Sequence, residues 1–124
     1  MQVFKLPDAQ KVFLDILNQI FEIEKKLEKI QESNTISRNL EKLKNIFATE
    51  LYADQAGLII HNPLGENYDS TRIDCDASIA GESTENLVIT EVIKPIIHYR
   101  SGGINHIVQK AVVIVQSKDT INQS

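Results

Sequence analysis

Three histidines are the side chains of this sequence best suited to hold a metal ion: His61, His98 and His106. His98 and His106 flank a predicted hairpin turn at residues 101–103 and would face each other across it. A zinc site needs about four ligands, so His61 or Asp74 would have to complete the set. No two of these residues have the close spacing of a zinc motif, and we therefore expect neither a metal site nor a metal cofactor.

Cys75 is the single cysteine and lies between two carboxylates, Asp74 and Asp76. A reactive thiol needs a lowered pKa, whereas flanking negative charges raise it, so we expect Cys75 to be structural. Asp69, Asp74 and Asp76 do not have the spacing of an EF-hand loop, and we expect solvated loop acids there. The chain also has no nucleophile elbow, phosphate-binding loop or metallohydrolase motif. The sequence therefore predicts a protein that is not an enzyme and uses no cofactor.

Composition and charge limit the partners expected for this chain of 124 residues. The net charge is −4, and residues 51–124 carry five Lys/Arg against nine Asp/Glu. Phosphate binding depends on basic side chains, so nucleic acid is not an expected partner. One cysteine cannot form an intramolecular disulfide, and no segment resembles a signal peptide or a membrane span. We therefore expect a cytoplasmic protein with no membrane contact.

Apolar residues at helical spacing predict two helices, over about residues 8–32 and about residues 36–52. Pro7 and Asp8 predict the start of the first helix, and Ser33-Asn34-Thr35 predicts the break between the two. The short connection favours an antiparallel helical hairpin. The apolar face of the first helix is wider than one partner helix needs, which favours a core or a dimer interface.

Beyond Gly57, which we expect to follow the second helix as its C′ residue, the sequence predicts a small β-domain. β-branched runs predict strands over residues 58–61, 87–93, 96–99, 104–108 and 111–115. Residues 66–86 are polar and predict a loop with at most one short strand, near residues 77–79. Pro95 cannot donate to a ladder, so the long hairpin should bend there. The expected fold class is α+β: a helical hairpin over residues 1–55, a mostly antiparallel β-domain over 56–118 and a polar tail over 119–124.

The order of these segments resembles the GrpE family of nucleotide exchange factors for DnaK-type chaperones. The resemblance covers about residues 12–118 and rests on a helix pair, a glycine-led first strand, the turn Gly65-Glu66-Asn67-Tyr68-Asp69, a strand that ends in Lys94, and a closing strand over residues 110–115. The chain also departs from the family pattern. The long N-terminal helix of the family has no counterpart here, Ser70 stands in place of a proline, and Pro95 stands in place of a glycine.

The resemblance implies a homodimer whose four helices form a bundle and whose β-domains reach a chaperone. Tighter binding to the open form of the chaperone's nucleotide-binding domain would speed nucleotide release without covalent chemistry. Motif matching implies partner contacts at Leu64, Tyr68, Asp69, Ile93 and Lys94. The expected dimer-interface residues are Phe13, Leu17, Ile20, Leu27, Leu40, Leu43 and Phe47.

Alternatives stay open for several of these residues and for the function. Tyr68 and Ile93 could pack in the core, and Asp69 could form an Asx turn. The chain could be a dimeric adaptor that holds another protein without exchange activity. It could also be a sensor of a small ligand or a metal ion that uses the hairpin histidines.

Overall fold

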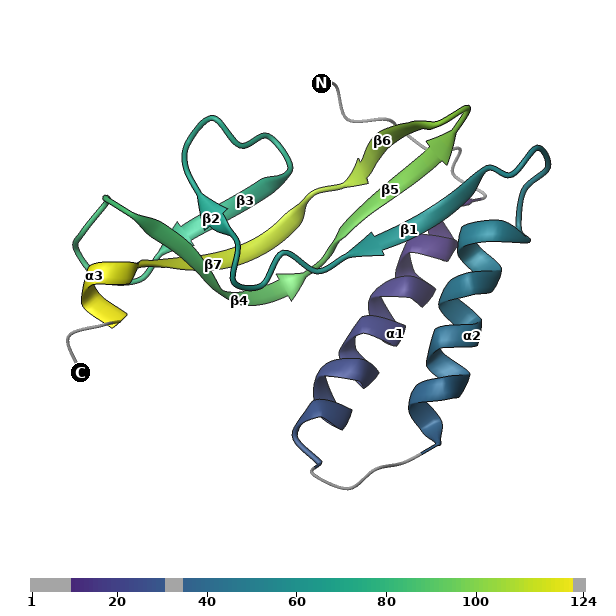
Figure 1. Ribbon diagram of the computed structural model, residues 1–124, viewed down its shortest axis with the longest axis horizontal. Helices are drawn as coiled ribbons and strands as arrows, with labels where there is room; N and C mark the ends of the chain where they lie inside the picture. The colour runs from purple at the N-terminus through teal and green to yellow at the C-terminus, as the bar shows by residue number, and fades with distance from the viewer. Residues whose placement is uncertain (1–9, 31–34, 122–124) are drawn as a thin grey trace.

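The computed structural model describes residues 10–30 and 35–121, and its elements follow the predicted order (Figure 1). Two helices come first, α1 (Lys11–Glu28) and α2 (Ile36–Thr49). The strands that follow are β1 (Gly57–His61), β2 (Asn67–Tyr68), β3 (Cys75–Ile79), β4 (Leu87–Lys94), β5 (Ile96–Ser101), β6 (Ile104–Gln109) and β7 (Ala111–Ser117), and a short helix, α3 (Lys118–Ile121), comes last. The α+β class, with a helical hairpin before a mostly antiparallel β-domain, is confirmed.

Both long helices form because apolar residues recur at helical spacing along one side and polar residues fill the other. Lys25 and Lys26 lie in the last turn of α1, where positive charge suits the helix dipole. The two helices end at Glu28 and Thr49, earlier than predicted. The predicted helix signals at Pro7-Asp8 and Ser33-Asn34 lie outside the described residues.

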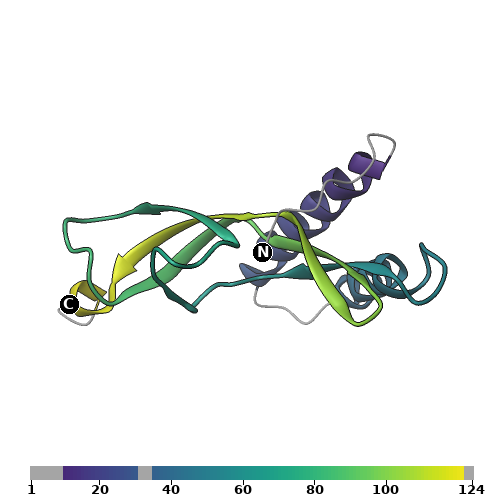
Figure 2. The same cartoon turned by 90° about the horizontal axis from the view of Figure 1, so that it is seen from above.

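The strands form two sheets that share one long ribbon (Figures 1 and 2). The three-stranded sheet has the order β1-β5-β6 and is antiparallel. The four-stranded sheet has the order β2-β4-β7-β3, in which β3 and β7 run parallel. β4 continues into β5 and β6 continues into β7, so the same two strands cross the whole β-domain. The ribbon turns at Gly102-Gly103, which have φ of 61° and 78°, and the predicted hairpin is confirmed.

The ribbon changes sheets at Pro95, as the missing N–H of proline predicts. Pro95 is fully buried, and its carbonyl oxygen accepts a hydrogen bond from Gln109 Nε2 at 2.9 Å. The side-chain amide of Gln109 also pairs with that of Asn18 on α1, through hydrogen bonds of 2.9 and 2.8 Å. The first helix is therefore tied directly to the bend in the ribbon.

Two clusters of buried side chains form the core. One cluster lies between the helices and the three-stranded sheet and contains Leu17, Ile20, Leu40, Phe47, Leu58 and Ile97. The other covers one face of the four-stranded sheet and contains Phe21, Cys75, Leu87, Ile89, Val92, Ile96, Ala111, Val113 and Val115. Each cluster joins helix residues to strand residues, so the helical hairpin and the β-domain share their core.

The prediction that Gly57 follows α2 as a C′ residue is wrong. The left-handed backbone after the helix belongs to Asp54 and Gln55, with φ of 60° and 62°. Gly57 instead begins β1 and is buried against the last turn of α2. A Cβ at Gly57 would overlap the Ala48 carbonyl oxygen and lie 2.9 Å from the Ala48 Cα. Glycine is needed here for a close approach of two backbones, and not for its freedom in φ.

The polar segment over residues 66–86 is more structured than predicted. It contains two strands, β2 and β3, and β3 extends over Cys75–Ile79. The partner of β3 is the distant strand β7, in parallel register from Cys75 opposite Ala111 to Ile79 opposite Val115. The predicted polar tail begins with the helical turn α3.

We expect Gly57→Ala to lower the free energy of unfolding by about 3 kcal/mol, because the added Cβ meets backbone atoms that cannot move aside. Gly102→Ala is the matched control, since its Cβ would meet open space and only its φ of +61° is unfavourable. That change should cost about 1 kcal/mol. Urea denaturation followed by circular dichroism measures both values. Equal losses in the two variants would contradict the proposed close approach.

Candidate functional site

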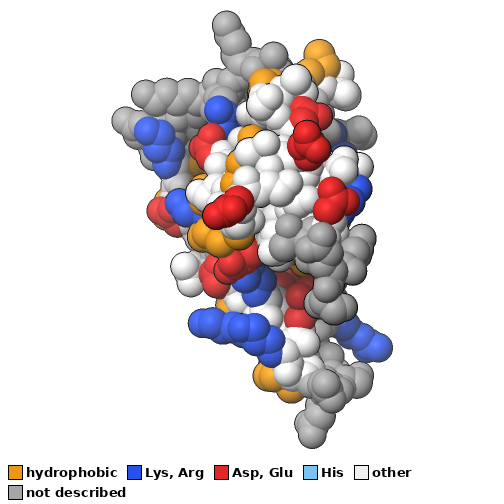
Figure 3. Space-filling view, turned by 90° about the vertical axis from the view of Figure 1, so that its left-hand side faces the viewer, with side chains coloured by type: hydrophobic (Ala, Val, Ile, Leu, Met, Phe, Trp, Pro, Cys, Tyr) orange, Lys and Arg blue, Asp and Glu red, His pale blue; other side chains and the backbone are white. Residues whose placement is uncertain are grey.

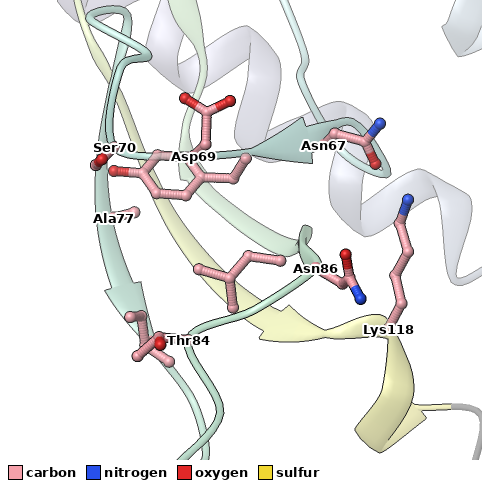
Figure 4. A pocket seen from close by; sticks show the side chains of 10 residues that line it. Asn67, Asp69, Ser70, Ala77, Thr84, Asn86 and Lys118 are labelled. Carbon is pink, nitrogen blue, oxygen red and sulfur yellow. The ribbon is translucent and has the colours of Figure 1, made fainter.

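A cavity of about 610 Å³ opens on the core-bearing face of the four-stranded sheet (Figure 4). We call the apolar part of its lining the floor: Tyr68, Ala77, Ile79 and Leu87. We call the polar part of its lining the rim: Asn67, Asp69, Ser70, Thr84, Asn86 and Lys118. These residues come from β2 and the segment after it, from β3, from the start of β4 and the segment before it, and from the first residue of α3.

The cavity forms because the side chains that cover this face of the sheet cover only one end of it. At the end near the helices, the cluster includes Phe21 of α1 and Ile96, and Ile60 packs against it. At the other end, Ile79 is 44% exposed although its partner Val115 is fully buried. Apolar surface at this end is therefore accessible to a ligand.

The five predicted partner contacts lie in three places. Tyr68 and Asp69 line the cavity. Leu64 is 53% exposed and lines a second hollow, of about 380 Å³, between α1 and β4. Ile93 and Lys94 are exposed at the end of β4 and belong to neither hollow.

Tyr68 and Asp69 both have roles within the chain. Tyr68 lies opposite the buried Leu87 and packs against the core cluster. The Oδ1 atom of Asp69 accepts hydrogen bonds from the Thr71 backbone N–H, at 2.8 Å, and from the Thr71 hydroxyl. These hydrogen bonds lower the pKa of the Asp69 carboxyl. The alternatives of core packing and an Asx turn therefore describe what these two side chains do inside one chain.

An ion-pair network holds the segment between β1 and β3, and Arg72 is at its centre. Arg72 donates to Asp74 Oδ1 at 2.7 Å, to Glu66 Oε1 at 2.8 Å and to the Asn67 carbonyl at 2.9 Å. The second oxygen of Glu66 lies 2.6 Å from Nε2 of His61. Each carboxylate has a nearby partner, so the network fixes β2 against the sheet. The sequence did not reveal this network, because no local pattern marks Arg72 as the common partner of Glu66, which precedes it, and Asp74, which follows it.

The three histidines do not converge. The rings of His61 and His98 have centroids 6.5 Å apart. The β5–β6 register pairs His106 with Tyr99 and places Ile107 opposite His98. His106 therefore projects from the other face of the sheet, and the prediction that it faces His98 is wrong. Among residues 10–30 and 35–121, no three His, Cys, Asp or Glu side chains are grouped to hold a metal ion.

Cys75 is a free, buried thiol in the core of the four-stranded sheet. Burial, together with the Asp74 carboxylate, raises the pKa of the thiol to about 11. A thiol that stays protonated at neutral pH is a poor nucleophile. The geometry therefore agrees with a structural role for Cys75.

Most of the predicted dimer-interface residues are already used within the chain. Leu17, Ile20, Leu40 and Phe47 are buried against the three-stranded sheet, Phe13 and Leu27 are partly buried beside them, and Leu43 is exposed. The helices expose a neighbouring apolar stripe, which we call the outer stripe: Ile16 and Ile23 on α1, and Leu43 and Ile46 on α2. These four side chains are between 42% and 44% exposed. Helical spacing finds both stripes but does not tell which one faces the sheet.

Charge is mixed on the end of the molecule that carries the four-stranded sheet (Figure 3). Acidic side chains predominate in the upper and middle part of this view, and basic ones gather at its left side and in its lower part. None of the described helices is long and apolar enough to span a membrane.

Comparisons with models of known protein families, with curated proteins and with solved structures find no match for this chain. Its function is therefore argued from its own surfaces: the cavity, the hollow at Leu64 with the nearby end of β4, and the outer stripe.

The network at Arg72 should make stability depend on pH. Burial alone would raise the pKa of the Asp74 carboxyl, but the hydrogen bonds and charge of Arg72 hold it below its usual value. A carboxylate of this kind stabilises the folded state above its unfolded pKa and loses that contribution as the pH falls through its folded value.

We expect Arg72→Met to lose about 2 kcal/mol of unfolding free energy at neutral pH, where the hydrogen bonds to charged groups are present. Between pH 5 and pH 2, roughly the range in which a salt-bridged carboxylate titrates, the variant should lose less further stability than the parent protein. Urea denaturation across this pH range measures both effects. Arg38→Met, at an exposed position of α2, is the control. The same acid-dependent loss in the parent protein and Arg72→Met would contradict the assignment.

Proposed function

We propose that this chain is a GrpE-like co-chaperone that binds a DnaK-type chaperone and promotes nucleotide exchange. The observation that carries the proposal is the order of a helical hairpin followed by a small β-domain, joined through a shared core. The resemblance implies this arrangement, with helices that dimerise and strands that reach the chaperone. The single free cysteine supports a reducing compartment, and we propose the cytoplasm.

The proposed chaperone contact is formed by Leu64, Ile93 and Lys94. Leu64 and Ile93 expose 53% and 45% of their surface, which a partner protein could bury. The hollow beside Leu64 has Phe21 and Val92 in its lining. Lys25 on α1 donates to the Val92 carbonyl at 3.0 Å, so this surface is backed by a fixed helix.

Exchange through this contact requires no covalent chemistry. The chain would bind the open form of the chaperone's nucleotide-binding domain more tightly than the closed form. Binding would then raise the population of the open form by the ratio of the two affinities, and nucleotide would leave faster. A β-domain that is ordered before binding suits this task, because ordering a flexible domain on binding would reduce its affinity for the chaperone.

An adaptor function is the second candidate, and one specific observation favours it. Tyr68 and Asp69, which the resemblance assigns to the partner contact, are engaged within the chain at the cavity, apart from Ile93 and Lys94. A smaller contact formed by Leu64, Ile93 and Lys94 could hold a partner protein without opening a nucleotide-binding domain.

We propose the outer stripe as the dimer interface. The double change Ile23→Asp and Leu43→Asp should give a folded monomer. Both side chains are exposed in the single chain, so the changes leave its core intact, but in the proposed bundle the new charges would be buried in the apolar interface. Leu17→Asp should instead unfold the chain, since Leu17 is fully buried beside the sheet. Sedimentation measures mass and circular dichroism measures folding. A parent protein that is monomeric at micromolar concentration would contradict the dimer.

Release of a fluorescent nucleotide from a DnaK-type chaperone tests exchange directly. We expect the parent protein to accelerate release, and the double change Ile93→Ser and Lys94→Ala to reduce the effect about tenfold, equivalent to ~1.4 kcal/mol of lost contact energy. Ile104→Ser is the matched control, since Ile104 is an exposed isoleucine at the far hairpin. No acceleration by a folded dimer would contradict exchange. Chaperone binding that persists without acceleration would support the adaptor.

A further inference from the structure

We propose that the cavity on the four-stranded sheet binds the C-terminal segment of a partner polypeptide, with the free carboxylate at Lys118. This inference does not rest on nucleotide exchange, because the cavity lies apart from Ile93 and Lys94. It rests on three features of the cavity: a polar end that carries a positive charge, an apolar floor and the free edge of a strand.

The positive end is formed by Lys118, Asn67 and Asn86, whose side chains lie together at one side of the cavity in Figure 4. No carboxylate of the described residues forms an ion pair with Lys118. The Lys118 backbone N–H donates to the Asn86 carbonyl at 2.9 Å, which keeps the two residues adjacent. An ammonium group and amide N–H groups are the donors that recognise a carboxylate.

Two acidic residues lie near the cavity: Asp69 in its lining, and Asp119 beside Asn86. Asp69 lies toward Ser70 and away from Lys118 in Figure 4. Its Oδ1 atom is engaged by Thr71, through the backbone N–H and the hydroxyl. Asn86 has one weak partner, Oδ2 of Asp119 at 3.4 Å from its Nδ2. Because an amide nitrogen carries two hydrogens, Asn86 can still donate to a ligand.

The floor selects an apolar side chain next to that carboxylate. Ala77, Ile79 and Leu87 supply aliphatic surface, and Tyr68 supplies an aromatic ring. The cavity of about 610 Å³ is large enough for a few residues, since small-ligand sites span roughly 300–1,000 Å³. An aliphatic residue at the end of a chain fits this floor.

The free edge of β3 favours a polypeptide over a small carboxylic acid. β3 is an edge strand, and its even-numbered positions bond to β7: the Asp74 carbonyl accepts from Ala111 and the Ala80 N–H donates to Val115. Backbone groups of alternate residues point to opposite sides, so those of Ala77 and Ile79 point to the free edge. The side chains of these same two residues line the cavity. An extended segment could therefore add to β3, and its last residues would then leave the edge and cross the floor toward Lys118, which follows β7.

Fluorescence anisotropy with a labelled hexapeptide, Gly-Thr-Ser-Thr-Val-Leu, tests the proposal. The label is at the N-terminus, and the C-terminus is either the free acid or an amide. We expect the parent protein to bind the acid at least tenfold more tightly than the amide. Lys118→Gln should remove that preference, whereas Lys42→Gln, on the exposed side of α2, should keep it. Both lysines are exposed, so neither change threatens the fold.

Three results would overturn the inference. Equal binding of acid and amide, or no binding of either up to millimolar peptide, would exclude a carboxylate site. A Lys118→Gln variant that keeps the preference would exclude Lys118 as its source. Displacement of the acid peptide by hexanoate at an equal concentration would assign the cavity to small carboxylic acids. Nucleotide release is measured separately, so failure of either proposal can be told from failure of the other.

Discussion

The bend at Pro95 is the constraint on which the rest of the structure depends. A continuous ladder through this point is impossible because proline has no N–H to donate. At this bend the Gln109 side chain donates to the Pro95 carbonyl, and it pairs with Asn18 on α1. The two strands of the ribbon thereby continue from one sheet into the other, and α1 is bound at the point where the sheets meet. Partly buried amide groups of this kind are stabilising only when each is paired, so the three groups depend on one another.

This arrangement determines which apolar surface remains exposed. The helices use their most apolar side to cover the three-stranded sheet, while Phe21 extends the cover to the four-stranded sheet. The outer stripe and the far end of the four-stranded sheet are left accessible. Both are apolar surfaces with polar borders, which is the pattern of an interaction site. The chain therefore offers separate surfaces for a second copy, for a partner protein and for a peptide end.

The network around Arg72 links these surfaces to the core. It holds β2 and the turn at Leu64 against the sheet, and those segments carry one proposed contact residue and one wall of the cavity. The segment is short of apolar residues, so charge-assisted hydrogen bonds supply the order that packing cannot. A polar loop is thus made rigid enough to present binding groups at fixed positions.

The sequence by itself determined the α+β order, the two helices, the hairpin turn at residues 101–103 and the bend at Pro95. Each of these follows from local chemistry: apolar periodicity, glycine at positive φ and the missing N–H of proline. It also predicted a structural Cys75, from the charges beside it. Only the tertiary structure decided that Gly57 serves a close approach, that β3 pairs with β7 and that Leu17 faces a sheet. Those outcomes depend on contacts between residues far apart in the chain, which leave no periodic signal. The cavity belongs to the same class, because its walls come from β2, β3, β4 and α3, which meet only in the folded protein.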